Sequence, residues 1–135
     1  MQLQYNGKTS AKSVKEKTKP ANLKQVFPDK PSKSKNKLIK GENLTVIQEL
    51  IKNYALKGKI DLIYIDPPFS TNTIFRVSDD RGSTISSSYK DGIAYKDTLN
   101  GKDFLEFIRK RLILLRELMS DKGSIYLHID YKIGH

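Results

Sequence analysis

Cysteine is absent from the 135-residue sequence, and histidine occurs only at His128 and His135. The lack of cysteine excludes a disulfide scaffold, a thiolate nucleophile and a cysteine-based zinc site. Two histidines do not supply a histidine-rich cluster, so we expect no bound metal. No apolar run approaches the roughly 18 residues that a membrane-spanning helix needs, and no apolar stretch follows the N-terminal lysines. We therefore expect a cytoplasmic protein with neither a membrane partner nor a secretory signal.

Acidic residues are scarce in the first part of a chain whose formal net charge is +10. Residues 1–36 hold nine lysines against Glu16 and Asp29, a balance of +7, whereas residues 37–135 hold 16 basic and 13 acidic residues, a balance of +3. A segment this rich in Lys, Ser and Pro cannot bury enough surface to offset its ordering entropy. We therefore expect a disordered arm over residues 1–36 and a folded part over residues 37–135. The arm is either an electrostatic contact for nucleic acid or a solubilising tail, and charge alone favours neither.

Strand and helix patterns alternate along the folded part. We expect strands over 38–40, 60–65 and 124–129, and helices over 43–56 and 103–119. Asn43 is the expected cap of the first helix, and Gly58 its stop. The strand over 60–65 is nearly continuous in apolar residues, which is typical of a strand buried on both faces of a parallel sheet. The order predicts an α/β fold with mostly parallel strands and right-handed crossovers.

Polar residues follow two of these strands at the point where each one ends. Asp66 follows the strand over 60–65, and Asp130 follows the strand over 124–129, before a helix that we expect from Lys132 onward. Active sites in parallel sheets lie at the carboxyl ends of strands, so Asp66 is a candidate site residue. Asp130 either lines the site or caps the last helix. The long polar stretch over 70–100 has no sustained periodicity, and we expect a functional or disordered loop there.

The most informative residues are the tetrapeptide Asp66-Pro67-Pro68-Phe69. A sequence of Asp-Pro-Pro-aromatic arises by chance about once in a thousand chains of this length, given a proline usage of about 5 %. A simple turn with a core phenylalanine beneath it is the alternative interpretation. The run over 61–69 resembles the catalytic motif of DNA amino-methyltransferases, which methylate exocyclic nitrogens of adenine or cytosine.

The flanking segments extend this resemblance over residues 37–135. They are the strand-Gly-acid segment over 38–44, the helix over 104–118 and the strand over 123–130, in the order found in the permuted β class, which includes type III restriction-modification enzymes. The resemblance implies an incomplete Rossmann-like methyltransferase fold with a mostly parallel sheet. It also implies methyl transfer from S-adenosylmethionine to the N6 amino group of adenine in DNA, as part of a restriction-modification system.

The resemblance also implies a role for each residue of the motif. The exocyclic amine of adenine is a poor nucleophile because its lone pair is delocalised into the ring. Asp66 would accept one N–H of this amine and the carbonyl of Pro67 the other, and Phe69 would stack on the base. Pro68 is the remaining residue of the catalytic motif. The base must leave the duplex, so the expected partner is double-stranded DNA with a flipped adenine. Aspartate rather than serine at the first position favours N6-adenine over N4-cytosine.

Further candidates are less specific. The resemblance implies that Glu42 and Asp66 contact the cofactor. For Glu42 the alternative is a structural role, because the helix dipole favours an acid in the first helical turn. Candidate DNA contacts in the stretch over 70–100 are Arg76, Arg81, Tyr89 and Lys90, which are otherwise ordinary loop residues. We interpret His128 as a strand residue rather than a ligand.

The glycine signature for S-adenosylmethionine, aromatic-x-Gly-x-Gly, is missing, because no two of the eight glycines are separated by a single residue. We therefore expect the N-terminal part of a larger enzyme, inactive by itself, that needs a complementary C-terminal methyltransferase part or a restriction subunit. Two other classes stay open: a non-catalytic basic DNA-binding protein, and an unfolded remnant without activity.

Overall fold

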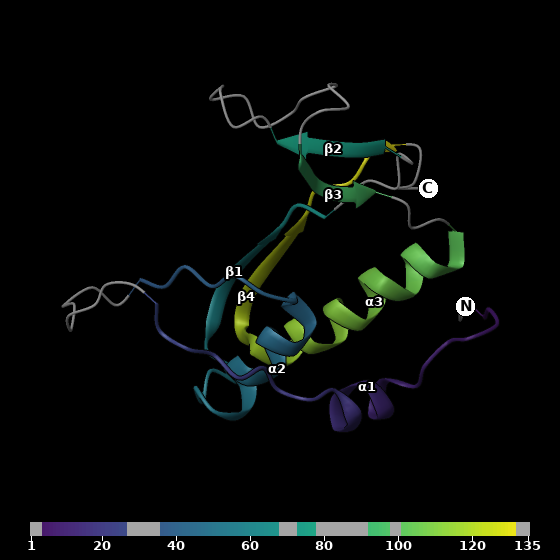
Figure 1. Ribbon diagram of the computed structural model, residues 1–135. Helices are drawn as coiled ribbons and strands as arrows, with labels where there is room; N and C mark the ends of the chain where they lie inside the picture. The colour runs from purple at the N-terminus through teal and green to yellow at the C-terminus, as the bar shows by residue number, and fades with distance from the viewer. Residues whose placement is uncertain (1–3, 27–35, 68–72, 78–91, 98–100, 132–135) are drawn as a thin grey trace. The chain divides into compact units, whose positions relative to one another are not determined.

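The computed structural model describes residues 4–26, 36–67, 73–77, 92–97 and 101–131 (Figure 1). The elements are α1 (Ala11–Lys17), α2 (Asn43–Lys52), β1 (Ile60–Ile65), β2 (Thr73–Val77), β3 (Gly92–Asp97), α3 (Gly101–Leu118) and β4 (Met119–Leu127). The chain divides into two compact units. The helical unit comprises Gly7–Ile63 and Arg109–Ser124, and the motif unit comprises Met1–Asn6, Tyr64–Ile108 and Ile125–His135.

Strands β1 and β4 pair as a two-stranded sheet (Figure 1). The Lys59 N–H donates to the Leu118 carbonyl at 2.9 Å, and the His128 N–H donates to the Ile65 carbonyl at 2.9 Å. Residue numbers rise together along both strands, so the strands run parallel, with α3 before β4 as a parallel crossover requires. This pairing confirms the predicted α/β class. Strand β4 begins at Met119 rather than at the predicted residue 124.

Gly123 allows the two strands to approach closely. A Cβ atom at this position would lie 2.8 Å from the Ile60 carbonyl oxygen and 3.2 Å from the Ser120 carbonyl oxygen. The first distance is shorter than ordinary van der Waals contact, so the position requires glycine. The Ser120 hydroxyl adds a side-chain tie, because it donates to Oδ1 of Asp61 at 2.5 Å.

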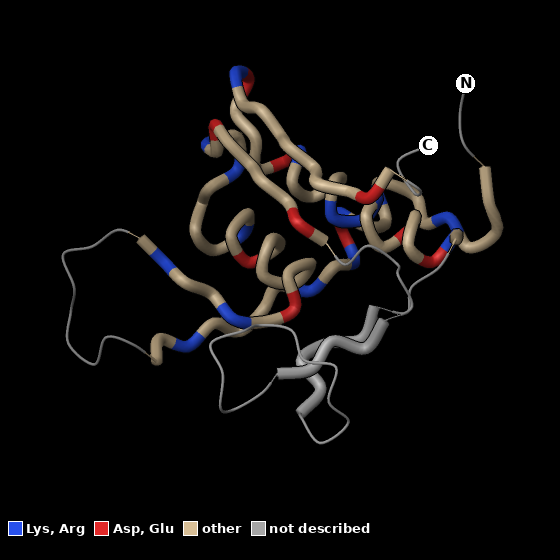
Figure 2. The backbone as a smooth tube through the Cα atoms, turned by 90° about the horizontal axis from the view of Figure 1, so that it is seen from above, with Lys and Arg blue, Asp and Glu red and all other residues tan. Residues whose placement is uncertain are grey.

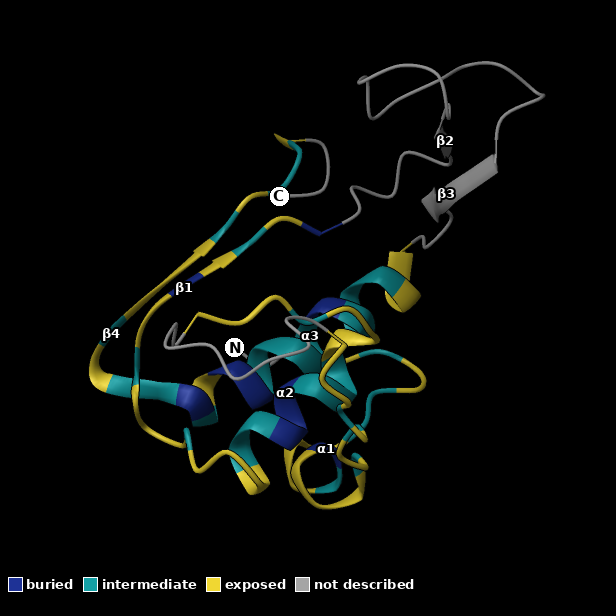
Figure 3. Ribbon diagram, turned by 60° about the vertical axis from the view of Figure 1, so that its left-hand side comes forward, coloured by how far each residue is buried: buried dark blue, intermediate teal, exposed yellow. Residues whose placement is uncertain are grey.

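Burial on both faces of β1, which the sequence predicts, is wrong for the described residues. Ile63 is buried, but the residues Leu62 and Tyr64 are 64 % and 66 % exposed. Figure 3 draws most of β1 in the colours of exposed and intermediate residues. A strand of a two-stranded sheet that is packed on one side buries every second residue. The apolar run in β1 therefore leaves one face of the strand exposed within the described part of the chain.

The core of the helical unit lies along α2 and α3. Its buried apolar residues are Val14, Ile47, Ile63, Leu114, Leu115 and Leu118. Helix α2 ends at Lys52, not at the predicted residue 56, because Asn53 takes the C-cap position and its side-chain amide donates to Oε2 of Glu49 at 2.7 Å. The chain then turns through Ala55, whose φ of 53° ends helical geometry before Gly58 is reached.

Helix α1 contradicts part of the predicted disorder over residues 1–36. Its N-cap Ser10 accepts a hydrogen bond from the Ser13 N–H at 3.1 Å, and its one large apolar residue, Val14, is 3 % exposed. The Ala21 N–H donates to the Thr45 carbonyl at 3.0 Å, which ties the segment to α2. A composition count misses such contacts because they depend on a few well-placed residues. Residues 27–35 lie outside the described residues.

Two further expectations differ from the structure. Residues 36–40 have no regular structure and Leu38 is fully exposed, so the strand predicted over 38–40 is wrong. The stretch over 70–100, predicted as a loop, contains the antiparallel pair β2–β3, with Thr73 opposite Asp97 and a register shift after Phe75. Residues 78–91, and the helix predicted from Lys132 onward, lie outside the described residues.

Candidate active site

Asp66 lies directly after β1, at the carboxyl end of a parallel strand. Its side chain is 63 % exposed, and the next residue, Pro67, is buried. Proline carries no backbone N–H and cannot extend the strand pairing, so the strand ends where the acid begins. An exposed carboxylate at the end of a rigid strand is available to accept hydrogen bonds from a ligand. Pro68 and Phe69 lie outside the described residues.

The end of β4 brings His128 to the Asp66 carboxylate. The His128 N–H is hydrogen-bonded to the Ile65 carbonyl, and its imidazole Nδ1 lies 4.0 Å from Oδ1 of Asp66. The same Nδ1 lies 3.3 Å from the Tyr64 hydroxyl, which fixes the ring from β1. At 4.0 Å the imidazole forms an ion pair with Asp66 only when it is protonated. The interpretation of His128 as a plain strand residue therefore missed a neighbour of the candidate catalytic acid.

A signal for this neighbour was present in the sequence. His128 and Asp130 follow β4 as Asp66 follows β1, and parallel strands place their carboxyl ends at the same edge of a sheet. The hydrogen bond between His128 and Ile65 shows that the ends of these two strands are adjacent. A position of Asp130 in the lining of the site stays a prediction.

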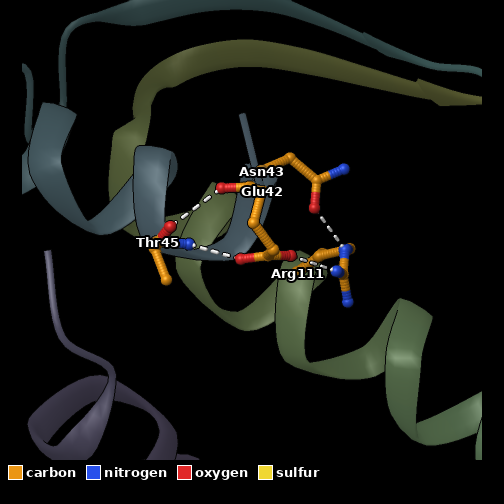
Figure 4. A network of polar contacts seen from close by, with 4 residues as sticks. All are labelled: Glu42, Asn43, Thr45 and Arg111. Atoms are coloured by element: carbon orange, nitrogen blue, oxygen red, sulfur yellow. Dashed lines mark hydrogen bonds and ion pairs between the residues drawn. The ribbon is translucent and has the colours of Figure 1, made fainter. Parts of the chain in front are cut away.

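Glu42 belongs to a separate polar network in the helical unit (Figure 4). One carboxylate oxygen accepts from the Thr45 N–H at 2.9 Å, and the other accepts from the Arg111 guanidinium at 2.6 Å. Asn43 accepts from Nε of Arg111 at 2.7 Å. The N-cap of α2 is thus Glu42 rather than the predicted Asn43, because its longer side chain reaches the Thr45 N–H from one position earlier.

The Arg111 side chain is the buried partner of this network. It is 11 % exposed, whereas the Glu42 side chain is 52 % exposed. Burial lowers the pKa of Arg111, and the charge of Glu42 and its hydrogen bond oppose that effect. Both Glu42 oxygens are engaged by the protein, which supports the structural interpretation of this residue. A cofactor contact by Glu42 stays a prediction.

The predicted DNA contacts lie in β2 or outside the described residues. Arg76 is in β2, next to a register shift and opposite Ile93 of β3, and its side chain is not described. Arg81, Tyr89 and Lys90 lie outside the described residues. Within the described residues, no helix is long and apolar enough to cross a membrane. No group of three or more Asp, Glu or His side chains in this part of the chain is arranged to hold a metal ion.

The described residues do not make up a site for S-adenosylmethionine. The sequence holds no turn with glycines one residue apart that would let the backbone approach such a group. The carboxylate of Glu42 already accepts hydrogen bonds from Thr45 and Arg111. The chemistry that these residues can perform is therefore hydrogen-bond acceptance at Asp66, beside an imidazole.

Comparison with known proteins places the chain in a family. Residues 60–134 match the family model described as DNA methylase. Over 97 residues the chain is 34 % identical to the probable type III restriction-modification enzyme HindVI Mod subunit of Haemophilus influenzae, covering 72 % of this chain and 10 % of that protein. Over 111 residues it is 36 % identical to the type III restriction-modification enzyme EcoP15I Mod subunit of Escherichia coli, covering 73 % and 17 %.

The type II methyltransferase M.EcaI of Enterobacter cloacae is 41 % identical over 75 residues, which cover 56 % of this chain and 14 % of that protein. The matches cover from 10 % to 17 % of the length of these three curated relatives. No solved structure matches the chain. Because the family model spans more than half of the chain, from β1 through β4, this protein belongs to the N6/N4 DNA methylase family.

Proposed function

We propose that this chain carries the amine-orienting part of a DNA methyltransferase that methylates the N6 amino group of adenine within a restriction-modification system. The observation that carries the proposal is the position of Asp66, an exposed carboxylate at the carboxyl end of parallel strand β1. Membership of the DNA methylase family and the similarity to Mod subunits support the same reaction. A Rossmann-like fold for the whole enzyme is part of the proposal.

The proposed role of Asp66 follows from the chemistry of an aryl amine. The lone pair of the adenine amine is delocalised into the ring, so the amine must be pyramidalised before it can attack a methyl group. A carboxylate that accepts one N–H and a backbone carbonyl that accepts the other hold the nitrogen in the sp³ form. Asp66 supplies the first acceptor and Pro67 the second. Holding the amine in line is itself a large part of the catalysis.

The substrate of the proposed reaction is a base outside the duplex. A base cannot reach the end of a strand while it is stacked, so the target adenine is flipped out of double-stranded DNA. Phe69 stacks on it in this proposal, and Pro68 is the remaining motif residue. The candidate DNA contacts are Arg76, Arg81, Tyr89 and Lys90. Aspartate at position 66 favours N6-adenine, and N4-cytosine is the second candidate.

The methyl donor of the proposed reaction is S-adenosylmethionine, which supplies an electrophilic methyl group. Since the sequence lacks the glycine turn and the described residues do not form the cofactor site, we infer that residues of a complementary methyltransferase part or of a restriction subunit hold the cofactor, with Asp66 as the contact from this chain. We expect the 135-residue chain by itself not to methylate DNA. Transfer of labelled methyl groups by the purified chain would contradict this inference. We also propose a cytoplasmic location for the enzyme.

A segment exchange tests the proposed function. Residues 60–134 replace the matching segment of the EcoP15I Mod subunit, and the hybrid is assayed for methyl transfer to DNA. The digested DNA is then analysed for the methylated base. The proposal expects N6-methyladenine, whereas N4-methylcytosine would favour the second candidate. A hybrid that folds and binds DNA but transfers no methyl group would contradict a catalytic role for this segment.

A further inference from the structure

Four of the exposed lysines over residues 12–24 of the helical unit form a set that we call the lysine strip. We define it as Lys12, Lys17, Lys19 and Lys24, which are all exposed. We propose that this strip is a docked contact surface for the phosphate backbone of double-stranded DNA, independent of base sequence. The proposal rests on the proposed function for the identity of the polyanion, and it adds a surface outside the motif unit that contains Asp66.

The backbone beneath the strip is fixed to the rest of the helical unit. Val14 is 3 % exposed, and the Gln48 side chain donates to the Lys15 carbonyl at 2.9 Å. The Ala21 N–H is bonded to the Thr45 carbonyl at 3.0 Å. These contacts hold α1 and the residues that follow it against α2. A docked strip has already lost its backbone freedom, so binding to it costs less entropy than binding to a free tail.

The lysines that form ion pairs within the protein are distinct from the four lysines of the strip. The charge of Lys15 is paired within the protein, because its Nζ lies 2.5 Å from Oε1 of Glu117. Lys57 lies 3.1 Å from the other oxygen of the same carboxylate. The four strip lysines form no ion pair with any described residue, and Glu16 is the only acidic residue over 9–26. Figure 2 marks the Lys and Arg positions of the described chain in blue.

The chemistry of the strip fits a phosphate backbone better than a membrane surface. Lysine ammonium groups are point charges that bind phosphates without reading base edges. An interfacial helix needs an exposed apolar face to enter a bilayer, but the one large apolar residue of α1, Val14, faces inward. A DNA methylase has to hold long duplexes while one base is removed from the stack, and phosphate contacts position the protein for that step.

Salt dependence of DNA binding measures the contacts directly. The probe is a short fluorescent duplex, titrated with the full 135-residue chain in a series of salt concentrations and followed by anisotropy. Each phosphate contact adds about 0.9 to the slope of log Kd against log salt. The variant Lys12→Gln/Lys17→Gln/Lys19→Gln is expected to lower this slope by about 2 to 3 and to weaken binding most at low salt.

A charge-matched variant provides the control. Lys52, Lys59 and Lys122 are exposed lysines of the same unit, and the change of all three to Gln removes the same net charge. A local contact surface predicts a small change of slope for this control. Equal slopes for the two triple variants would overturn the proposal, because net charge alone would then account for binding. The absence of salt-dependent binding by the unmodified chain would overturn it as well.

A second variant tests whether docking matters. Val14→Asp places a charge in a buried position and is expected to release α1 while it keeps all four strip lysines. The proposal expects weaker DNA binding, with the far-ultraviolet circular dichroism of α2 and α3 retained. Unchanged binding would show that the lysines act as a free tail and would overturn the docked surface. Because these readouts are binding constants, their failure leaves the role of Asp66 in methyl transfer separately testable.

Discussion

Glu42 and Arg111 form an ion pair at 2.6 Å that joins the N-terminus of α2 to α3 (Figure 4). The acid is half-exposed and caps α2, whereas the guanidinium is largely buried and also binds Asn43. The pair therefore combines a helix cap, a charge-assisted hydrogen bond and a contact between helices. Its geometry gives the acid before α2 a structural role in capping the helix and binding Arg111.

Loss of this acid is expected to destabilise the helical unit. Glu42→Ala removes the cap of α2 and leaves the Arg111 guanidinium without its carboxylate partner. We expect a loss of about 1–2 kcal/mol in the free energy of unfolding, because Glu42 is partly solvent-exposed. Urea unfolding followed by circular dichroism measures the change. Glu42→Asp is the control, since it keeps the charge but shortens the reach, and an Ala variant as stable as the parent chain would contradict the capping role.

Low pH is expected to weaken the ion pair between Lys15 of α1 and Glu117 of α3. Hydrogen bonds from Lys15 and Lys57 hold the pKa of Glu117 below its ordinary value of 4.5. A carboxyl group with a lowered folded-state pKa stabilises the fold above its unfolded pKa, and this contribution is lost as the pH falls through the folded pKa. Glu117→Gln should therefore be less stable at neutral pH and should lose less stability between about pH 5 and pH 3.

Urea unfolding at a series of pH values measures this linkage. Asp121→Asn is the matched control, because Asp121 is exposed and forms no ion pair with a described residue. The control should follow the pH dependence of the parent chain. If the stability of Glu117→Gln had the same pH dependence as that of the parent chain, the lysine contacts would not be coupled to folding.

The buried valine of α1 is expected to control the accessibility of the N-terminal lysines. Val14→Ala removes two methyl groups from a site that is 3 % exposed, which costs about 1–2 kcal/mol of local stability. Limited trypsin digestion should then cleave after Lys12 and Lys17 faster than in the parent chain. The exposed control Val26→Ala should leave these rates unchanged, and equal rates for both variants would contradict the docking of α1.

The close approach at Gly123 predicts a sharp difference between two glycines. Gly123→Ala would bring a Cβ within 2.8 Å of the Ile60 carbonyl oxygen, so the backbone of β4 must shift, at a cost of about 1–3 kcal/mol. Gly41→Ala is the control, because its nearest neighbour would be Val46 at an ordinary 3.5 Å. Thermal unfolding of both variants compares them. Equal melting temperatures would contradict the observed pairing of β1 and β4.

The parts of the fold that depend on local patterns could be predicted from the sequence. The apolar run over 60–65 and the apolar stripe over 103–119 predict β1 and α3 to within two residues, and the structure places Asp66 directly after β1, at the end of a parallel strand. A role of Asp66 in the site stays a prediction. The exposure of Leu62 and Tyr64 could not be predicted. A strand pattern shows which residues are apolar, but not how many layers cover them.

Long-range contacts account for the other differences. Val14 docks α1 although the composition around it indicates disorder, because one buried side chain and a few hydrogen bonds to α2 suffice. Glu42 takes the cap from Asn43 because its longer side chain reaches the Thr45 N–H, and Arg111, distant in sequence, holds the other oxygen of its carboxylate. His128 reaches Asp66 only through the pairing of β1 and β4. Each of these positions is determined by a residue far away along the chain.

The most direct test of the central claim is the rate of methyl transfer by the EcoP15I hybrid after Asp66→Ala. We expect a loss of at least about 100-fold in kcat, because the amine loses the acceptor that holds it in the reactive form. Asp66→Asn, which keeps one acceptor oxygen, should retain part of the activity, and unchanged DNA binding would show that both variants fold. Turnover by Asp66→Ala at the rate of the unmodified hybrid would contradict the account.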